Sequence, residues 1–158
     1  MIRKIVQKPN KTLFKPSKPV KDFDDPEIQA LITDLIDTIK ADENAAGLAA
    51  PQIGENKQIF TVKDSDSGQV RVFANPDITH RANKKSLHQE ACLSVPGKAG
   101  LVERAKKVIV KAYDKDGGKF KITAKGFLAQ VIQHEYDHLQ GTLFIDKAEK
   151  VVDVENKT

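Results

Sequence analysis

One helix constrains this chain more than any other segment. Across residues 125–140, apolar side chains recur every three or four positions, which is typical of a helix with one buried face. His134 and His138 fall one turn apart on this helix, so their side chains lie on the same side. Thr123 is a candidate cap at its start, and Gly141 is a stop signal at its end. We therefore expect a buried central helix that brings two imidazole groups to one point.

The two histidines have the spacing of a pair of metal ligands. Glu135 follows the first of them and points about 100° further around the helix, where it could accept a proton from a water on the ion. The alternative is a solvated face with two unrelated histidines, but the flanking apolar stripe argues against it. A catalytic divalent ion usually has three protein ligands and one open position. The helix alone therefore supplies only two of the three protein ligands that such a metal site needs.

Cys92 is the only cysteine in the chain. It excludes an intramolecular disulfide and a four-cysteine zinc module. Residues 139–158 contain no further histidine, so a third ligand has to come from upstream, where Cys92 lies in a turn-like stretch at residues 90–97. A lone cysteine is more often an inert buried thiol. Beside a histidine pair that lacks its third ligand, we favour Cys92 as that ligand.

Composition is that of an ordinary globular protein of one domain, with 158 residues, 39% of them hydrophobic and 30% charged. No apolar stretch approaches the roughly 20 residues that cross a bilayer, and the N-terminus lacks the apolar core of a secretory signal. We therefore expect a cytoplasmic protein with no membrane partner.

The net charge of +4 arises in the basic first 21 residues, which have no interleaved aromatic side chains. No specific nucleic acid is therefore expected.

The other segments predict a second helix and two hairpins. Asp25 is a cap and Pro26 a first residue for a helix whose apolar stripe should lie on a sheet. Strands are expected at 58–63, 70–75, 106–113 and 119–123, with the step Asn75-Pro76 ending the second. The elements together predict one α+β domain, with small antiparallel or mixed sheets packed around a central metal-binding helix. This domain should comprise residues 1–146, followed by a short, charged and frayed tail at 147–158.

Three blocks of sequence carry a resemblance to a known family. In chain order they are Gly47-Leu48-Ala49-Ala50-Pro51-Gln52, Glu90-Ala91-Cys92-Leu93-Ser94 and Gln133-His134-Glu135-Tyr136-Asp137-His138. At these separations they resemble the three signature motifs of peptide deformylases, and the likeness covers nearly the whole chain up to Asp146. The HExxH pattern of the third block is shared with many hydrolases, whereas the set of three is highly specific.

The resemblance implies a metal ion and a reaction. The ion would be Fe(II), replaceable by nickel, cobalt or zinc, and would be held by Cys92, His134 and His138. The reaction is the removal of the N-formyl group from the N-terminal methionine of newly synthesised polypeptides, with release of formate. The partners would then be N-formylated nascent peptides and, weakly, the ribosome.

The resemblance also implies roles for four other residues. A metal-bound water would attack the formyl carbon, with Glu135 as general base and then as general acid. A side-chain N–H of Gln52 and the backbone N–H of Leu93 would stabilise the oxyanion. Gly47 would let the peptide backbone approach and pair as an added strand, although a tight turn would also explain a glycine there.

Several residues depart from the family pattern. Ala45 and Ala91 stand where the family has glycine, and each would cost about 1 kcal/mol or more if its backbone needed a positive φ. The pocket for the methionine side chain is usually apolar, so the substrate preference here could be broader or different. The residues at the corresponding positions are Ala46, His88, Phe127 and Gln130.

Two other functions remain open on the sequence alone. A zinc metallopeptidase shares HExxH and the glutamate mechanism, but it would take a histidine or carboxylate as its third ligand. A deformylase-like protein without activity could instead be an RNA- or ribosome-associated binding module, although the intact Glu135, Gln52 and ligand set argue against this. Replacement of Cys92 by alanine separates the first alternative from a deformylase.

Overall fold

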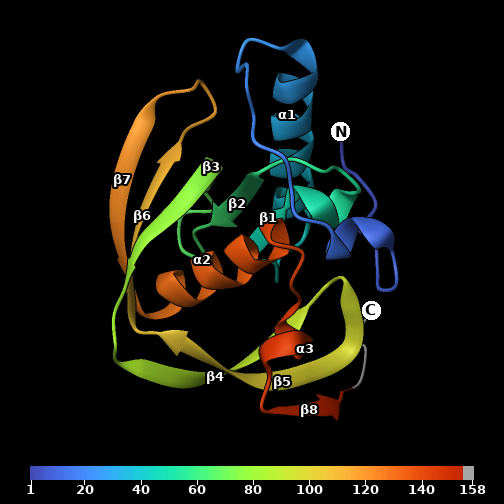
Figure 1. Cartoon of the computed structure of the whole chain (residues 1–158). Coiled ribbons are helices and arrows are strands. Elements are labelled where there is room, and N and C mark those ends of the chain that lie inside the picture. The colour runs from blue at the N-terminus through green and yellow to red at the C-terminus, as the bar shows by residue number, and fades with distance from the viewer. Residues whose placement is uncertain (155–158) are drawn as a thin grey trace.

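The computed structural model describes residues 1–154. It contains two sheets and three α-helices, and the central helix α2 contacts strands of both sheets (Figure 1). The strands are β1 (Gly47–Ala49), β2 (Ile59–Lys63), β3 (Val70–Arg81), β4 (Lys85–Cys92), β5 (Val95–Ala105), β6 (Lys107–Tyr113), β7 (Lys119–Lys125) and β8 (Lys150–Asp153). The helices are α1 (Pro26–Ala41), α2 (Gly126–Leu139) and α3 (Phe144–Lys147), with 3-10 helices at Lys11–Phe14 and Ala50–Ile53.

The larger sheet has the strand order β1-β2-β3-β6-β7, and the smaller has the order β4-β5-β8. All pairs of named strands are antiparallel. The chain passes from the larger sheet to the smaller after β3 and returns before β6. The expected α+β class, with small sheets around a central helix, is confirmed. None of the helices in residues 1–154 is long and apolar enough to cross a membrane.

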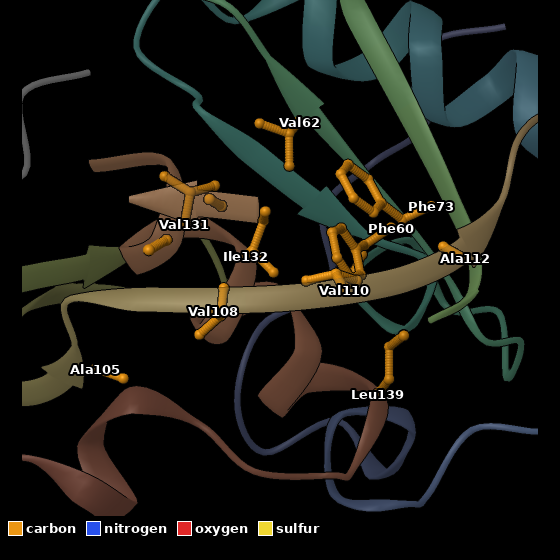
Figure 2. Packing of buried hydrophobic residues seen from close by; sticks show 13 residues of the cluster. Phe60, Val62, Phe73, Ala105, Val108, Val110, Ala112, Val131, Ile132 and Leu139 are labelled. Atoms are coloured by element: carbon orange, nitrogen blue, oxygen red, sulfur yellow. The ribbon is translucent and has the colours of Figure 1, made fainter. Parts of the chain in front are cut away.

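The larger sheet is covered by one helix on each face. Along β2, Phe60 and Val62 belong to the core beneath α2, whereas Ile59 belongs to the core beneath α1, because successive strand residues point to opposite faces. Figure 2 shows Val131 and Ile132 of α2 packed toward the strand side chains. Each large aliphatic side chain buried in this way stabilises the fold by about 1.5 to 3 kcal/mol.

The first helix begins and ends close to where its sequence predicts. The Asp25 side chain accepts a hydrogen bond from the backbone N–H of Glu27, and Pro26 is the first helical residue. The predicted apolar stripe is buried against β1, β2 and β3. Its buried residues are Ile28, Leu31, Ile32, Leu35 and Ile39, and the sixth predicted residue, Ile36, is half-buried.

The prediction that Asn75-Pro76 ends a strand is wrong, since β3 continues to Arg81. Asn75 has a φ of 47°, and the pairing with β6 shifts register between Ala74 and Asp77. A bulge at this point removes the need for a ladder N–H at Pro76. The Asn75 side chain also binds the backbone of Val20 through both its oxygen and its nitrogen. The strand therefore bends at the proline without ending.

Three other local predictions also differ from the structure. Thr123 lies inside β7, and the residue before α2 is Lys125, which makes no side-chain cap. The predicted turn-like stretch at 90–97 is a hairpin of β4 and β5, joined by a short turn. The predicted frayed tail is wrong for Lys150–Asp153, which form the edge strand β8 against β5. Residues 155–158 of that tail lie outside the described part of the chain.

Candidate metal centre

Three side chains that could bind one ion converge where α2 meets the smaller sheet. Cys92 is the last residue of β4, and His134 and His138 lie one turn apart on α2. Their ligand atoms all lie within 4.8 Å of one another, and Cys92 Sγ is 3.4 Å from His138 Nε2. Bonds of about 2.3 Å to sulfur and 2.0 Å to nitrogen would place two tetrahedral ligands about 3.5 Å apart. The donor set and its spacing therefore fit one divalent metal ion.

The carboxylate of Glu90 orients the ring of His134. His134 Nδ1 donates a hydrogen bond of 2.7 Å to Glu90 Oε1, so Nε2 is the ring atom that could bind an ion. Burial alone would lower the pKa of His134, but its hydrogen bonds to Cys92 and Glu90 raise that pKa well above its usual value. An ion at Nε2 would therefore take the place of a proton. Arg104 donates two further bonds of 2.8 Å to the same carboxylate. Burial alone would raise the pKa of Glu90, but the hydrogen bonds from Arg104 and His134 lower that pKa to about 2. The carboxylate is therefore charged at neutral pH.

Arg104 also ties this network to the far end of α2. Its Nη1 donates a bond of 2.6 Å to Asp137 Oδ2, and Lys147 Nζ of α3 donates a bond of 3.0 Å to Asp137 Oδ1. Arg104, Glu90 and Asp137 are all buried. Buried charges persist when each is paired and hydrogen-bonded. The network therefore fixes β4, β5, α2 and α3 relative to one another around the ligands.

His138 reaches the site as a neutral imidazole. Burial, together with the charges of His134 and Arg104, holds the pKa of His138 well below its usual range. The neutral form is the one that binds metal ions. This protonation state supports the fit between the three side chains and an ion.

Glu135 is buried beside the ligands, with 4% of its surface exposed. Burial raises the pKa of Glu135 to about 7, against the opposing charge of His134. Its Oε1 atom is buried and has no hydrogen-bond partner in the described part of the chain, which is unusual for a carboxylate oxygen. A carboxyl group that titrates near neutrality can both accept and return a proton.

Gly47 leaves the space that Glu135 occupies. A Cβ atom built at Gly47 would lie 2.6 Å from Glu135 Oε2 and 2.7 Å from Glu135 Cγ, closer than such contacts allow. Gly47 begins β1 opposite Val62 and has no left-handed φ. The alternative of a tight turn at this glycine is therefore wrong, because Gly47 lies in a strand and its missing side chain accommodates the carboxylate.

Gln52 directs an amide N–H toward the cysteine. This buried side chain belongs to the 3-10 helix after β1, and its Oε1 accepts a hydrogen bond of 3.0 Å from the backbone N–H of Ala49. Its Nε2 lies 3.4 Å from Cys92 Sγ and 3.3 Å from Ser94 Oγ. Leu93, in the turn between β4 and β5, lines the same pocket. Of the two residues expected to stabilise an oxyanion, Gln52 thus contacts Cys92, and Leu93 follows Cys92 in the chain and lines the same pocket.

The site opens into a pocket of about 740 Å³. Three of the residues expected near a methionine side chain line this pocket, namely Ala46, Phe127 and Gln130. His88 does not line it, and its Nε2 instead lies 2.8 Å from Ser86 Oγ.

Neither Ala45 nor Ala91 has a positive φ, so the alanines at the family's glycine positions are not strained. Val154, within the predicted tail, also lines the pocket.

Sequence reasoning did not assign roles to Glu90, Arg104 or Ser94. The sequence did contain a signal for Glu90. It precedes Cys92 by two residues, and a strand places residues two apart on the same face, so a strand at this point would have predicted that Glu90 lies beside Cys92. The interpretation of residues 90–97 as a turn concealed it. Arg104 comes close to the ligands only through the tertiary structure. Ser94 follows Cys92 by two residues, but its contact with Gln52 arises only in the fold.

The comparisons with known proteins agree with this geometry. The family model for polypeptide deformylase matches residues 2–153. The chain belongs to this family. Peptide deformylase 1 of Clostridium perfringens is 43% identical over 145 residues, which are 92% of this chain and 97% of that protein. Peptide deformylase 2 of Vibrio cholerae is 43% identical over 146 residues, 92% of this chain and 85% of that protein.

Solved deformylase structures share the fold. A crystal structure of a peptide deformylase from Legionella pneumophila superposes with a TM-score of 0.87 at 42% identity, covering 94% of this chain and 87% of that one. The peptide deformylase from Synechococcus elongatus, in complex with actinonin, has a TM-score of 0.86 at 36% identity, covering 94% and 79%. This chain is a hydrolase of the deformylase family.

Proposed function

We propose that this protein is a metal-dependent peptide deformylase, which removes the N-formyl group from the N-terminal methionine of newly synthesised polypeptides and releases formate. The observation that carries the proposal is the convergence of Cys92, His134 and His138 next to the buried carboxylate of Glu135. Its membership of the deformylase family supports the same reaction. We assign the reaction to residues 1–146, which include every proposed ligand and catalytic residue.

Four residues perform the steps that the protein itself contributes. An ion on the three ligands supplies a Lewis acid and makes a water acidic enough to be deprotonated near neutral pH. Glu135 accepts the proton of the water that attacks the formyl carbon, and it later returns a proton to the leaving amine. The side-chain N–H of Gln52 and the backbone N–H of Leu93 stabilise the oxygen that gains negative charge. Gly47 keeps the position of the Glu135 carboxylate free and leaves β1 open to a peptide backbone.

The ion in the cell is proposed to be Fe(II), with zinc, nickel or cobalt able to replace it in purified protein. A Cys/His/His set accepts several borderline ions, so geometry alone does not select among them. The substrates are N-formylated nascent peptides in the cytoplasm, and a weak association with the ribosome would bring the enzyme to them.

Formate release from formyl-Met-Ala tests the reaction. The purified protein should release formate under anaerobic conditions when iron, nickel or zinc is the only metal supplied, and rapid loss of activity in air would identify iron. Metal-loaded protein that releases no formate would contradict the proposal.

Cys92→Ala separates this enzyme from a zinc metallopeptidase. The variant should lose bound metal, measured by elemental analysis, together with formate release. A variant that kept both would refute the role of Cys92 and favour a peptidase with a different third ligand. His80→Ala is a matched control, since His80 lies on the exposed part of β3 away from the ligands, and it should retain metal and activity.

A further inference from the structure

The outward face of the β6–β7 hairpin is a lysine surface, defined here as Lys107, Lys111, Lys119, Lys121 and Lys125. The register pairs Lys107 with Lys125 and Lys111 with Lys121, so these residues share one side of the sheet. The alternate residues Val108, Val110 and Ala124 are buried in the core with α2 on the other side. Four of the five lysines are exposed, and Lys107 is half-buried.

No ion pair of the described residues neutralises this lysine surface, although Phe23, whose ring packs 5.7 Å from that of Tyr113 on the same face, lies between Asp22 and Asp24. The ion pairs found in residues 1–154 include none of its five members. Asp77 of β3, opposite Lys111, is the one acidic residue whose strand register places it on this face. In the hairpin loop, Asp114 accepts bonds from the backbone N–H groups of Asp116 and Gly118, so its carboxylate is occupied within the loop.

The fold gains nothing from this arrangement of charges. Like charges directly opposite each other in an antiparallel pair destabilise the sheet. Lysines do protect exposed edge strands from pairing with other chains, and β7 is an edge. That explanation does not extend to Lys107 and Lys111, because β6 lies inside the sheet between β3 and β7. A surface that is costly in the folded protein and not needed for edge protection points to an anionic partner.

We propose that the lysine surface binds the phosphate backbone of RNA without sequence preference. On β7, Lys119, Lys121 and Lys125 lie on one face over six residues, roughly 20 Å of strand, with Thr123 between the last two. Sequence-independent binding rests on such contacts to phosphates. The one aromatic ring on the face, Tyr113, lies 6.0 Å from Lys119 Nζ, so the face has no free stacking platform for bases.

The same features favour RNA over a lipid surface. Proteins that lie on membranes insert apolar side chains beside their basic residues, and the face offers only Ile109 and Tyr113, which are both half-buried. The first 21 residues are basic but make a poorer site. Arg3 there is engaged by Asp34 and Glu55, and the rest of that segment forms no continuous sheet face.

One end of the lysine surface lies close in sequence to a residue of the pocket. Lys125 ends β7, and Phe127, two residues later at the start of α2, is 63% exposed and lines the pocket. RNA held on the lysine surface would therefore keep the pocket close to the same RNA-containing particle. The proposal extends the weak ribosome association suggested above, but RNA binding itself does not depend on the deformylase reaction.

Fluorescence anisotropy with a short labelled RNA hairpin tests the proposal on the metal-loaded, full-length protein. The wild type should bind, and its affinity should fall steeply with salt. The variant Lys111→Gln/Lys119→Gln/Lys121→Gln should bind at least tenfold more weakly at low salt. Its slope of log affinity against log salt should be smaller by about two to three, since each lost phosphate contact removes about 0.7 to 0.9.

The matched control carries the same change of net charge in the N-terminal segment. In Lys4→Gln/Lys11→Gln/Lys15→Gln, three exposed lysines are removed, and RNA affinity should stay within about threefold of the wild type. Equal weakening in the two triple variants would overturn the proposal, because total charge and not the lysine surface would then govern binding. Absence of RNA binding by the wild type at low salt would overturn it as well.

Two further measurements test whether the partner is RNA or a membrane, and whether binding by the lysine surface is separate from catalysis. Vesicles that contain phosphatidylserine should bind the wild type less tightly than RNA does. Binding to vesicles but not to RNA would overturn the proposal in favour of a membrane. Both triple variants should release formate from formyl-Met-Ala at the wild-type rate, because none of the replaced lysines lines the pocket. A failure of formate release in the wild type would contradict the proposed function. The RNA-binding proposal would still be tested by the anisotropy measurement, which does not depend on that reaction.

Discussion

Gly47 and Glu135 are coupled by sterics at the scale of single residues. The carboxylate occupies the volume where any other residue at position 47 would place its Cβ. This explains a glycine in a strand, where such a residue normally weakens pairing and packing. The proposed general base is therefore positioned by a missing side chain, as well as by the helix that carries it.

Gly47→Ala should reduce the kcat for formate release by about 100-fold, since a displacement of about 1 Å in a catalytic group can have an effect of this size. Metal content should remain that of the wild type, because no ligand is touched. The control uses Glu135→Gln, which itself should lower the rate by about 10² to 10⁴. Adding Gly47→Ala to Glu135→Gln should change the rate little, and a full further 100-fold loss would show that Gly47 acts through another group.

Gln52 has two roles that a variant can separate. Its Nε2 faces Cys92 and Ser94, while its Oε1 satisfies the buried N–H of Ala49. Gln52→Ala should lower kcat by about 10² to 10³ through loss of an oxyanion donor. It should also lower the free energy of unfolding by about 1 to 3 kcal/mol, because the Ala49 N–H loses its partner.

Ser94→Ala is the matched control for Gln52. The amide of Gln52 remains held by Ala49 when the serine hydroxyl is removed, so formate release should fall less than tenfold. Urea denaturation and steady-state kinetics on both variants check the two roles. Wild-type activity in Gln52→Ala would contradict its assignment as an oxyanion donor.

At the scale of elements, the β6–β7 hairpin retains a repulsion that one substitution should relieve. Lys121→Glu places a carboxylate opposite Lys111 and converts a like-charge pair into an opposite-charge pair. The melting temperature should rise by about 1 to 3 °C, while RNA affinity should fall. Lys119→Glu, on the same strand opposite Tyr113, makes the same change of charge without an opposing lysine and should give a smaller rise. An equal rise in both variants would mean that net charge alone is responsible.

The elements differ in how far their sequences predict them. Both long helices were predictable because their apolar stripes have helical spacing and their ends carry Asp25-Pro26 and Gly141, whose φ of 78° suits a glycine. The hairpin of β4 and β5 was not predicted, because the inward positions of these strands include charged Glu90 and Arg104, whose burial depends on pairing with each other. Sequence patterns do not reveal such a pairing. The three proposed metal ligands were predicted from the spacing of the histidines, the lack of another candidate and the resemblance to a family. Their support by Arg104 of β5 and Lys147 of α3 was not predicted.

At the scale of the whole molecule, the site joins parts that are distant in the sequence. Gln52 follows the first strand of the larger sheet, Cys92 ends a strand of the smaller sheet, and the histidines come from the helix between them. An ion at this point would therefore cross-link the two halves of the fold and stabilise it by mass action. The buried network of Glu90 and Arg104 spans the same junction without an ion.

That network should make the stability of the whole molecule depend on acid pH. The pKa of Glu90 is lowered to about 2 in the folded protein from an ordinary value of 4.5. A lowered pKa contributes stability that is fully present above about pH 4.5 and is lost as the pH falls toward 2. Glu90→Gln removes this contribution and leaves the buried positive charge of Arg104 without one of its two carboxylate partners. At pH 7 the free energy of unfolding of the variant should therefore be lower by about 3 kcal/mol.

The difference between the wild type and Glu90→Gln should therefore shrink as the pH is lowered below about 4.5. Urea denaturation of both proteins from pH 7 to pH 3, with a chelator in every sample, measures the difference without a contribution from bound metal. Asp37→Asn serves as a comparison, because Asp37 pairs with the terminal amine of Met1 at the exposed surface, and surface pairs contribute little. A difference between wild type and Glu90→Gln that stayed constant over this range would show that Glu90 stabilises the fold through its shape and packing and not through its charge.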